Sequence, residues 1–147
     1  MIMSFDSVFS SLSVSGSGLG AEQARMKAIA ENIANANTTR TPEGGPYRRQ
    51  RVIFASVLSS AMRSGLQRSP APAGVRVAGV VRSTEPPISI FDPDHPDADK
   101  TGHVAVPNIS VPNEMIDMIA AARSYEANLA AIRNFKTMVS KAMSILR

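Results

Sequence analysis

The chain of 147 residues contains no cysteine and no tryptophan. Without cysteine it cannot form a disulfide, a thiolate metal site or a thiol nucleophile. The absence fits a chain that stays unfolded during export and then matures in an oxidising space. Aromatic residues make up only 5% of the sequence, so we do not expect a large aromatic-lined active site.

The sequence also lacks a recognisable secretory signal and a long apolar run. No Lys or Arg precedes Arg25, and serine, aspartate and glycine interrupt the first apolar residues. No apolar run approaches 18 residues, so no membrane-spanning helix is predicted. The protein is therefore expected either to be cytoplasmic or to be exported by a route that reads another signal.

Charge is unevenly distributed along the chain, although the formal net charge is only +4. Residues 38–83 hold eight arginines against Glu43 alone, a net charge of +7. Residues 84–114 hold six acidic residues against Lys100, a net charge of −5. Opposite charges on neighbouring segments favour self-association or internal pairing over a single nucleic-acid-binding face.

The last stretch, residues 113–147, repeats apolar side chains at alternating steps of three and four. The repeat comprises Met115, Met118, Ala122, Tyr125, Leu129, Ile132, Val139, Met143 and Leu146. Without an internal Gly or Pro, it is typical of a coiled-coil seam, and Asn113 and Glu114 are placed to cap and charge its first turn. A helix about 50 Å long would result, and it needs a partner helix of similar length.

Residues 3–37 supply a candidate partner helix. A seven-residue apolar repeat runs through Phe5, Leu12, Leu19, Met26 and Ile33. Gly16, Gly18 and Gly20 each cost about 1 kcal/mol relative to Ala in a helix. We therefore expect this helix to form only when its apolar stripe is buried against the C-terminal helix or another subunit. The alternative is a short helix over residues 21–35 behind a flexible tail.

Between the two arms the sequence favours short strands. Residues from 47 onward begin as a strand that mixes arginines with β-branched side chains. A second strand around residues 75–81 is expected to break at Gly79, by a bulge. Short extended stretches follow at residues 88–91 and 104–106.

These patterns predict a mainly α fold with a small β-rich insert. The N- and C-terminal helices are expected to pair as an antiparallel coiled coil, with a β-hairpin or strand region between them. The predicted divisions are an N-terminal helical arm at 1–37, the insert with its loops at 38–112, and a long C-terminal helix at 113–147.

The insert offers two weak candidates for a metal site. A calcium-binding loop is suggested by four closely spaced aspartates, Asp92, Asp94, Asp97 and Asp99. Counted from Asp92, however, the sixth and twelfth positions hold Asp97 and His103, where an EF-hand needs Gly and Glu. The competing interpretation is a solvated turn that pairs with the arginine-rich segment. His95 and His103 lack a thiolate or helix-spaced partner for zinc. No metal or other cofactor is predicted.

Other chemistry has little support in the sequence. No Ser/His/Asp set lies in a recognisable catalytic context, so no enzymatic activity is predicted. Arg48, Arg49 and Arg51 beside Tyr47 could contact phosphates, which leaves a basic nucleic-acid-binding module as the alternative to a polymer contact. A calcium-dependent adhesion module is a third class.

Three stretches carry a resemblance to a known family. They are residues 30–49 (AENIANANTTRTPEGGPYRR), residues 91–108 with the FDPDHPDAD and VAVPN motifs, and residues 111–128 (VPNEMIDMIAAARSYEAN). Together they resemble the bacterial flagellar basal-body rod proteins of the FlgC type over nearly the whole chain. The asparagine-rich motif is shared by the wider rod and hook family, whereas the TPEGGPYR and HPDAD motifs narrow the resemblance to the FlgC type.

The resemblance implies a structural subunit of the flagellar basal body. Such proteins are exported unfolded by the flagellar type III export apparatus without a cleaved signal peptide. In the periplasm they polymerise into a tubular rod that transmits torque, with their terminal helices lining the tube and the insert facing outward. The implied partners are copies of itself, other rod proteins, the basal adaptor of the rod and the export apparatus. Nucleic acid and small-molecule substrates are not expected.

We predict two groups of functional residues from these patterns. The assembly seam is expected to comprise Leu19, Met26, Ile33, Met118, Tyr125, Leu129 and Ile132. The turn and polar contacts are assigned to Asn32, Asn35, Asn37, Arg48 and Arg49.

Overall fold

The computed structural model describes residues 5–58 and 72–145, and in these ranges two long helices flank four strands. The elements, in chain order, are α1 (Phe5–Ala34), β1 (Gln50–Leu58), β2 (Pro72–Arg82), β3 (Ile88–Phe91), β4 (His103–Val106) and α2 (Val111–Ile145). The predicted class, mainly helical with a small β insert, is confirmed.

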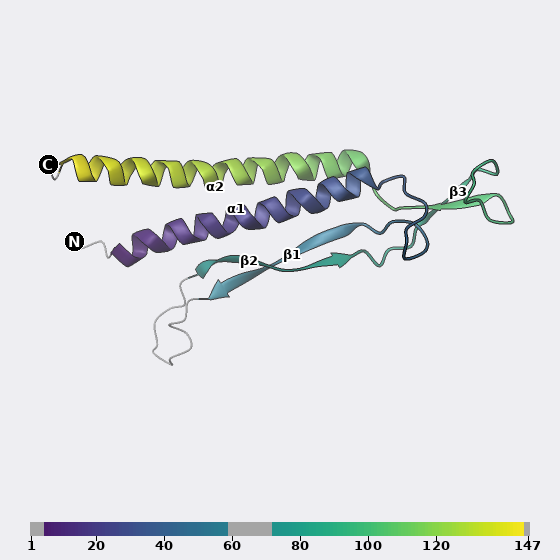
Figure 1. The fold of residues 1–147 in the computed structure, drawn as a ribbon, viewed down its shortest axis with the longest axis horizontal. Helices are drawn as coiled ribbons and strands as arrows, with labels where there is room; N and C mark the ends of the chain where they lie inside the picture. The colour runs from purple at the N-terminus through teal and green to yellow at the C-terminus, as the bar shows by residue number, and fades with distance from the viewer. Residues whose placement is uncertain (1–4, 59–71, 146–147) are drawn as a thin grey trace.

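The two helices lie side by side and run in opposite directions, with the start of α1 and the end of α2 at the same end of the molecule (Figure 1). Asn32 meets Glu114 at one end of this contact, and Gly18 lies against Asn128 further along. α1 is one continuous helix through Gly16, Gly18 and Gly20. Of the two alternatives for this arm, the structure contains the long helix.

The ends of the helices differ slightly from the predicted positions. α2 begins at Val111, two residues before the expected start, with Pro112 inside its first turn. A proline is tolerated there because the first backbone amides of a helix have no partner within the helix. The amide of Glu114 donates to the carbonyl of Ser110 (3.0 Å). α1 ends at Ala34, close to the predicted end.

β1 and β2 form an antiparallel pair with two register shifts, each of which leaves one extra residue in β2. Ile53 pairs with Gly79 and Phe54 with Val77, so Ala78 has no partner in the register. This irregularity lies next to the glycine at which the sequence predicted a break. β1 starts at Gln50, three residues later than expected. For residues 55–66 the sequence allows either an extension of this strand or a short helix; β1 continues to Leu58, and residues 59–66 lie outside the described residues.

The β1–β2 pair packs against α1, so the molecule has three layers over this length, with α1 between α2 and the strands (Figure 1). The amide of Val75 donates to Ser17 Oγ (3.0 Å), which itself donates to the carbonyl of Val14 (2.8 Å). Gly74 has a φ of 131°, and a side chain there would collide with Ser17 Oγ. Glycine therefore allows the strand to approach the helix closely.

β3 and β4 form a second, shorter antiparallel hairpin beyond the end of α1 (Figure 1). Ile88 pairs with Val106, and Phe91 pairs with His103. The rings of Phe91 and His103 meet edge to face with centroids 5.3 Å apart. Asp97, in the loop between these strands, accepts from Thr39 Oγ1 (2.7 Å), which ties the hairpin to the segment that follows α1.

The core in the described residues is small. Its buried apolar side chains are Ala21, Ala28, Ile29, Ala36, Val104 and Ala121. The two largest fully buried side chains are polar, Asn32 and Glu114, each 1% exposed. Neither of the two helices, over its described length, combines the length and apolarity needed to cross a bilayer. The described apolar core is thus small and mostly alanine, and the contact between the helices includes a buried polar pair.

Candidate assembly interface

Asn32 of α1 lies at the centre of a polar cluster where both helices and β1 meet. Its Nδ2 donates to the carbonyl of Gln50 (2.9 Å) and to Glu114 Oε2 (3.0 Å). Its Oδ1 accepts from the amide of Gln50 (2.8 Å) and from the hydroxyl of Tyr47 (3.2 Å). Both ends of the amide are therefore satisfied, as burial of a polar group requires.

Glu114 of α2 is the charged member of this cluster. Arg49 Nε and Nη2 both lie 2.5 Å from Glu114 Oε1, and Arg49 Nη2 also reaches Asp117 Oδ2 at 3.4 Å. Arg25 of α1 contacts the other oxygen of Asp117 at 3.6 Å. A buried carboxylate requires such a partner, because an unpaired buried charge is strongly destabilising. We call these residues the polar junction: Arg25, Asn32, Tyr47, Arg49, Gln50, Glu114 and Asp117.

Tyr47 supplies a hydroxyl donor to the junction. Burial raises the pKa of its phenol above the usual value, and the nearby charge of Glu31 raises it further. The phenol therefore stays protonated at neutral pH and can donate to Asn32 Oδ1. The junction is thus a closed set of donors and acceptors whose polar atoms are used within the molecule.

The predicted turn and polar-contact residues fall in different places. Asn32 and Arg49 belong to the polar junction. Asn35 closes the end of α1, because its Nδ2 donates to the carbonyl of Glu31 (2.9 Å) and its Oδ1 accepts from Thr38. Asn37 and Arg48 are exposed.

Sequence reasoning missed the role of Glu114, which it assigned only to the first turn of the helix. Glu114, Met118, Ala121 and Tyr125 follow steps of four, three and four, so they share one face of α2. That spacing could have placed the carboxylate against α1. The partners Tyr47 and Gln50 had no comparable signal, because they reach the junction only through the fold.

All seven residues of the predicted seam are partly buried in the single chain. These are Leu19, Met26, Ile33, Met118, Tyr125, Leu129 and Ile132. Other members of the α2 repeat are open to solvent, namely Met115 (56% exposed), Val139 and Met143, while Leu146 lies outside the described residues. Ala121, absent from the predicted repeat, is completely buried. The face of α2 that meets α1 is therefore rotated toward Glu114 and Ala121.

Large apolar side chains remain exposed on α2, on the β1–β2 pair and on β3. On α2 they are Met115, Ile116, Ile119, Met138, Val139 and Met143. On the β1–β2 pair they are Ile53, Phe54, Val77, Val80 and Val81, and on β3 they are Ile88, Ile90 and Phe91. Apolar exposure on this scale marks surfaces that bind another protein.

The aspartate-rich loop between β3 and β4 uses two of its carboxylates internally. Asp99 accepts from Thr101 Oγ1 (2.6 Å) and from the amides of Thr101 (2.7 Å) and His103 (3.0 Å). The hydrogen bond from the Thr101 hydroxyl, followed by those from the two amides, lowers the pKa of Asp99 to about 2. Asp97 lies 3.9 Å from Arg40. No group of three or more potential metal ligands occurs within residues 5–58 and 72–145.

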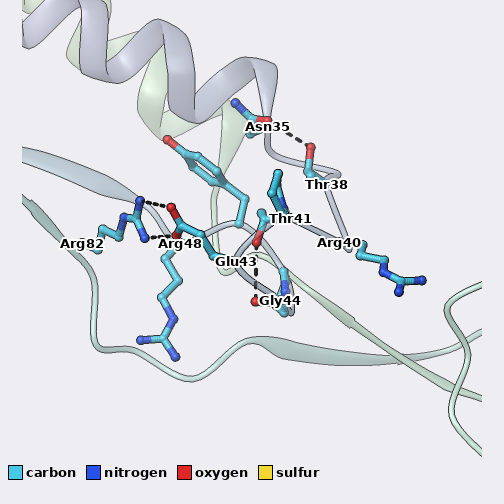
Figure 2. Close-up of a pocket in the computed structure, with 11 residues that line it drawn as sticks. Asn35, Thr38, Arg40, Thr41, Glu43, Gly44, Arg48 and Arg82 are labelled. Atoms are coloured by element: carbon cyan, nitrogen blue, oxygen red, sulfur yellow. Dashed lines mark hydrogen bonds and ion pairs between the residues drawn. The ribbon is translucent and has the colours of Figure 1, made fainter.

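A hollow of about 480 Å³ opens in the segment between α1 and β1 (Figure 2). Arg82 forms two hydrogen bonds to Glu43 across it, one of them 3.0 Å long, and this contact lowers the pKa of Glu43 and raises that of Arg82. Arg40 and Arg48 point away from this pair (Figure 2). The charged groups of the hollow therefore diverge instead of surrounding one ligand position.

Two family models match the ends of the chain. The model described as flagella basal body rod protein matches residues 12–40, and the model described as flagellar basal body rod FlgEFG protein C-terminal matches residues 100–145. These ranges include most of α1 and all of α2 within the described residues, together with the junction residues Asn32 and Glu114.

Curated relatives named flagellar basal-body rod protein FlgC align with almost the entire chain. The protein of Borreliella burgdorferi is 42% identical, and the alignment covers 95% of this chain and 98% of the relative. The chain belongs to the FlgC family of flagellar basal-body rod proteins. The FlgC proteins of Bacillus subtilis (37% identical, 93% and 97% covered) and Salmonella typhimurium (34%, 90% and 92%) agree.

Membership of the FlgC family makes this protein a structural subunit of the flagellar basal-body rod, and hence a component of the motility apparatus. The family resemblance inferred from the three sequence stretches is confirmed.

Proposed function

We propose that this FlgC protein polymerises through its terminal helices, with α1 and α2 paired as an antiparallel coiled coil. The observation that carries this proposal is the exposure of large apolar side chains on α2, including Met138 at 69% and Ile116 at 65%. Each such side chain contributes roughly 1.5–3 kcal/mol when it is buried. A single copy leaves this free energy unused, and neighbouring subunits would recover it.

The proposed seam consists of the half-buried residues on the two helices, Leu19, Met26, Ile33, Met118, Tyr125, Leu129 and Ile132. Partial burial supports a dual role, in which one side of each residue contacts the partner helix and the other contacts a neighbour. Asn35, Asn37 and Arg48 are proposed to hold the turn and to make polar contacts near it. Asn32 and Arg49 would keep the two arms in register.

We assign a separate structural role to each of three segments of the chain. The arms at 1–37 and 113–147 form the wall of a periplasmic tube, and the insert at 38–112 faces outward. The tube transmits torque, because the polar junction ties the insert to both helices in each subunit. A sideways load on the insert would then be passed to the arms through short, charge-assisted hydrogen bonds.

Export is proposed to occur through the flagellar type III apparatus without a cleaved signal peptide. The lack of cysteine and the three glycines of α1 support a chain that is easily kept unfolded. The proposed partners are further copies of the chain, other rod proteins, the basal adaptor of the rod and the export apparatus.

A purely structural role, without catalysis or nucleic-acid binding, completes the proposal. The curated relatives are rod proteins by name. Arg49 forms ion pairs with Glu114 and Asp117, so Arg48, Arg49 and Arg51 do not act as one unpaired basic patch. This arrangement disfavours the nucleic-acid alternative, which needs several cations on one face.

The seam is tested by Leu129→Asp, which places a charge on a half-buried apolar position. We expect normal secretion of the variant into the periplasm, but loss of its incorporation into basal bodies and loss of swimming. Ser124→Asp, at an exposed position of the same helix outside residues 136–144, is the matched control and should swim normally. Wild-type swimming by Leu129→Asp would contradict the proposed seam.

A further inference from the structure

The strands β1 and β2, together with Arg48, form a surface that carries only positive charge, here called the basic pair. Its residues 48–58 and 72–82 include five arginines and no acidic residue. Arg49 and Arg82 are neutralised by Glu114 and Glu43. The guanidinium groups of the other three, Arg48, Arg51 and Arg76, are exposed and make no ion pair with any described residue.

The β3–β4 hairpin with its loop and the residues just before it, here called the acidic hairpin (residues 84–106), has the opposite character. It contains five acidic residues, and Lys100 is its sole Lys or Arg. Asp97 and Asp99 are used in internal contacts. The carboxylates of the remaining three, Glu85, Asp92 and Asp94, are exposed and have no ion-pair partner within the described residues.

Each of these two surfaces also exposes apolar side chains beside its free charges. On the basic pair, Ile53 is 45% exposed and Val81 49%, and both lie on the same face of the strands as Arg51 and Arg76. On the acidic hairpin, Ile90 is 48% exposed and Phe91 65%. Each sheet has only two strands in the described residues, so each also leaves strand edges without a backbone partner. The two surfaces therefore carry opposite charges, and both expose apolar side chains that a binding partner could bury.

Within one copy, only Glu85 among the acidic residues of the hairpin comes near the basic pair, where it lines hollows together with Arg48 and Arg51 without forming an ion pair with a described residue. The basic pair lies along α1, whereas β3 and β4 extend past the end of that helix (Figure 1). The contacts of Asp97 with Thr39 and Arg40 hold the acidic hairpin in this direction. The free charges of both surfaces therefore remain available to a neighbour.

We infer that the acidic hairpin of one copy docks against the basic pair of the next copy, in a head-to-tail contact. This inference rests on the proposed polymerisation and names one of its contacts. Two different surfaces meet, so the contact repeats from copy to copy and builds an axial structure instead of a closed dimer. The opposite charges orient the copies, and burial of the apolar side chains stabilises the contact.

The absence of cysteine makes a direct test possible. Cells co-express two tagged copies, one with Val81→Cys and one with Ile90→Cys, and purified basal bodies are treated with a short bismaleimide. We expect a cross-linked dimer that contains both tags, and no comparable dimer when either variant is expressed alone. Replacing Val81→Cys by Val139→Cys, which is exposed on α2, gives the matched control and should abolish the mixed dimer.

A charge-reversal step separates charge pairing from mere proximity. Arg51→Glu with Arg76→Glu in the Val81→Cys copy should lower the mixed dimer at least about fivefold, since each exposed pair is worth roughly 1.4- to 5-fold in an equilibrium constant. Asp92→Arg with Asp94→Arg in the Ile90→Cys copy should restore it.

The outcomes separate this contact from the proposed function. Swimming cells whose basal bodies contain both copies but yield no mixed dimer overturn the head-to-tail contact alone. A cross-link from Ile90→Cys to a different rod protein also overturns it. If the wild-type chain is absent from basal bodies, polymerisation into the rod fails, and this contact fails with it.

Discussion

At the scale of single residues, Asn32 and Glu114 decide how the two arms meet. Both are 1% exposed, in a molecule whose described apolar core is mostly alanine. An asparagine on a helix interface satisfies its hydrogen bonds in only one alignment, so it selects the register at some cost in stability. Glu114 extends the same selection to β1 through Arg49. Two polar side chains thus align three elements.

We predict that Glu114→Gln destabilises the monomer by about 1–3 kcal/mol. Each oxygen of Glu114 accepts from a donor, Arg49 on one side and Asn32 on the other. The amide group of glutamine would place a donor against one of these donors. Urea unfolding followed by circular dichroism measures the loss.

Asp117→Asn is the control for this variant. The Asp117 side chain is 40% exposed, and its distances to Arg49 (3.4 Å) and Arg25 (3.6 Å) are long. The expected loss of stability is therefore under about 1 kcal/mol. Equal losses for the two variants would show that the junction is not centred on Glu114.

Asp99 gives the β3–β4 loop a defined dependence on pH. Its pKa in the folded loop is about 2, below the usual value of about 3.9 for an unfolded chain. Because the folded pKa is the lower one, the stabilisation is present above pH 3.9 and is lost as the pH falls through 2. The amide chemical shifts of Thr101 and His103 should therefore titrate with a midpoint near 2.

The matched variant for this titration is Asp99→Asn, whose amide oxygen can still accept a hydrogen bond but does not ionise. The low-pH titration of the two amides should disappear in this variant. A midpoint near 4 in the wild type would refute the assignment of these hydrogen bonds to the Asp99 carboxylate.

At the scale of the elements, the glycines of α1 have separate roles. Gly18 lies against Asn128 of α2, and a Cβ there would come within 2.9 Å of the Asn128 side-chain nitrogen. Gly16 and Gly20 have no atoms within 4 Å of such a Cβ. Gly18 thus accommodates the helix contact, whereas the other two only lower the stability of the helix.

We predict that Gly16→Ala and Gly20→Ala each stabilise the purified monomer by about 0.5–1 kcal/mol. Alanine loses less backbone entropy on folding, and space is free at both positions. Gly18→Ala should gain less or lose stability, because Asn128 must move. Thermal unfolding of the three variants checks the order, and the largest gain at Gly18 would contradict it.

At the scale of the whole molecule, the protein is elongated and exposes large apolar side chains along α2 and on its strands (Figure 1). α2 has 35 residues and α1 has 30. Each helix therefore buries only part of the apolar surface of the other. This shape suits a subunit that completes its apolar contacts in an assembly, as expected for a rod protein.

Hydrogen exchange should show directly which parts of α2 are unprotected in the monomer and protected in the rod. Amides of residues 136–144 in α2, where nearly all side chains are exposed, should exchange at least about tenfold faster in the monomer than in the assembled rod. Amides beside the polar junction, such as that of Gln50, should be protected in both states. Equal rates for residues 136–144 in the two states would contradict burial of this end in the rod.

The sequence by itself determined the existence of the two long helices, the β insert between them and the family. These features are local: heptad spacing, prolines and glycines, and contiguous motifs need no knowledge of distant contacts. The strand break near Gly79 and the end of α1 also followed from local signals.

The tertiary structure alone decided which face of α2 meets α1 and which side chains close the junction. Met115 belonged to the predicted repeat and Ala121 did not, but Met115 is 56% exposed and Ala121 is completely buried. The reason is that one buried carboxylate, Glu114, needs Arg49 and Asn32 together, and these come from positions 65 and 82 residues away. Hydrogen bonds across such separations place Glu114, instead of Met115, in the buried contact at the start of α2.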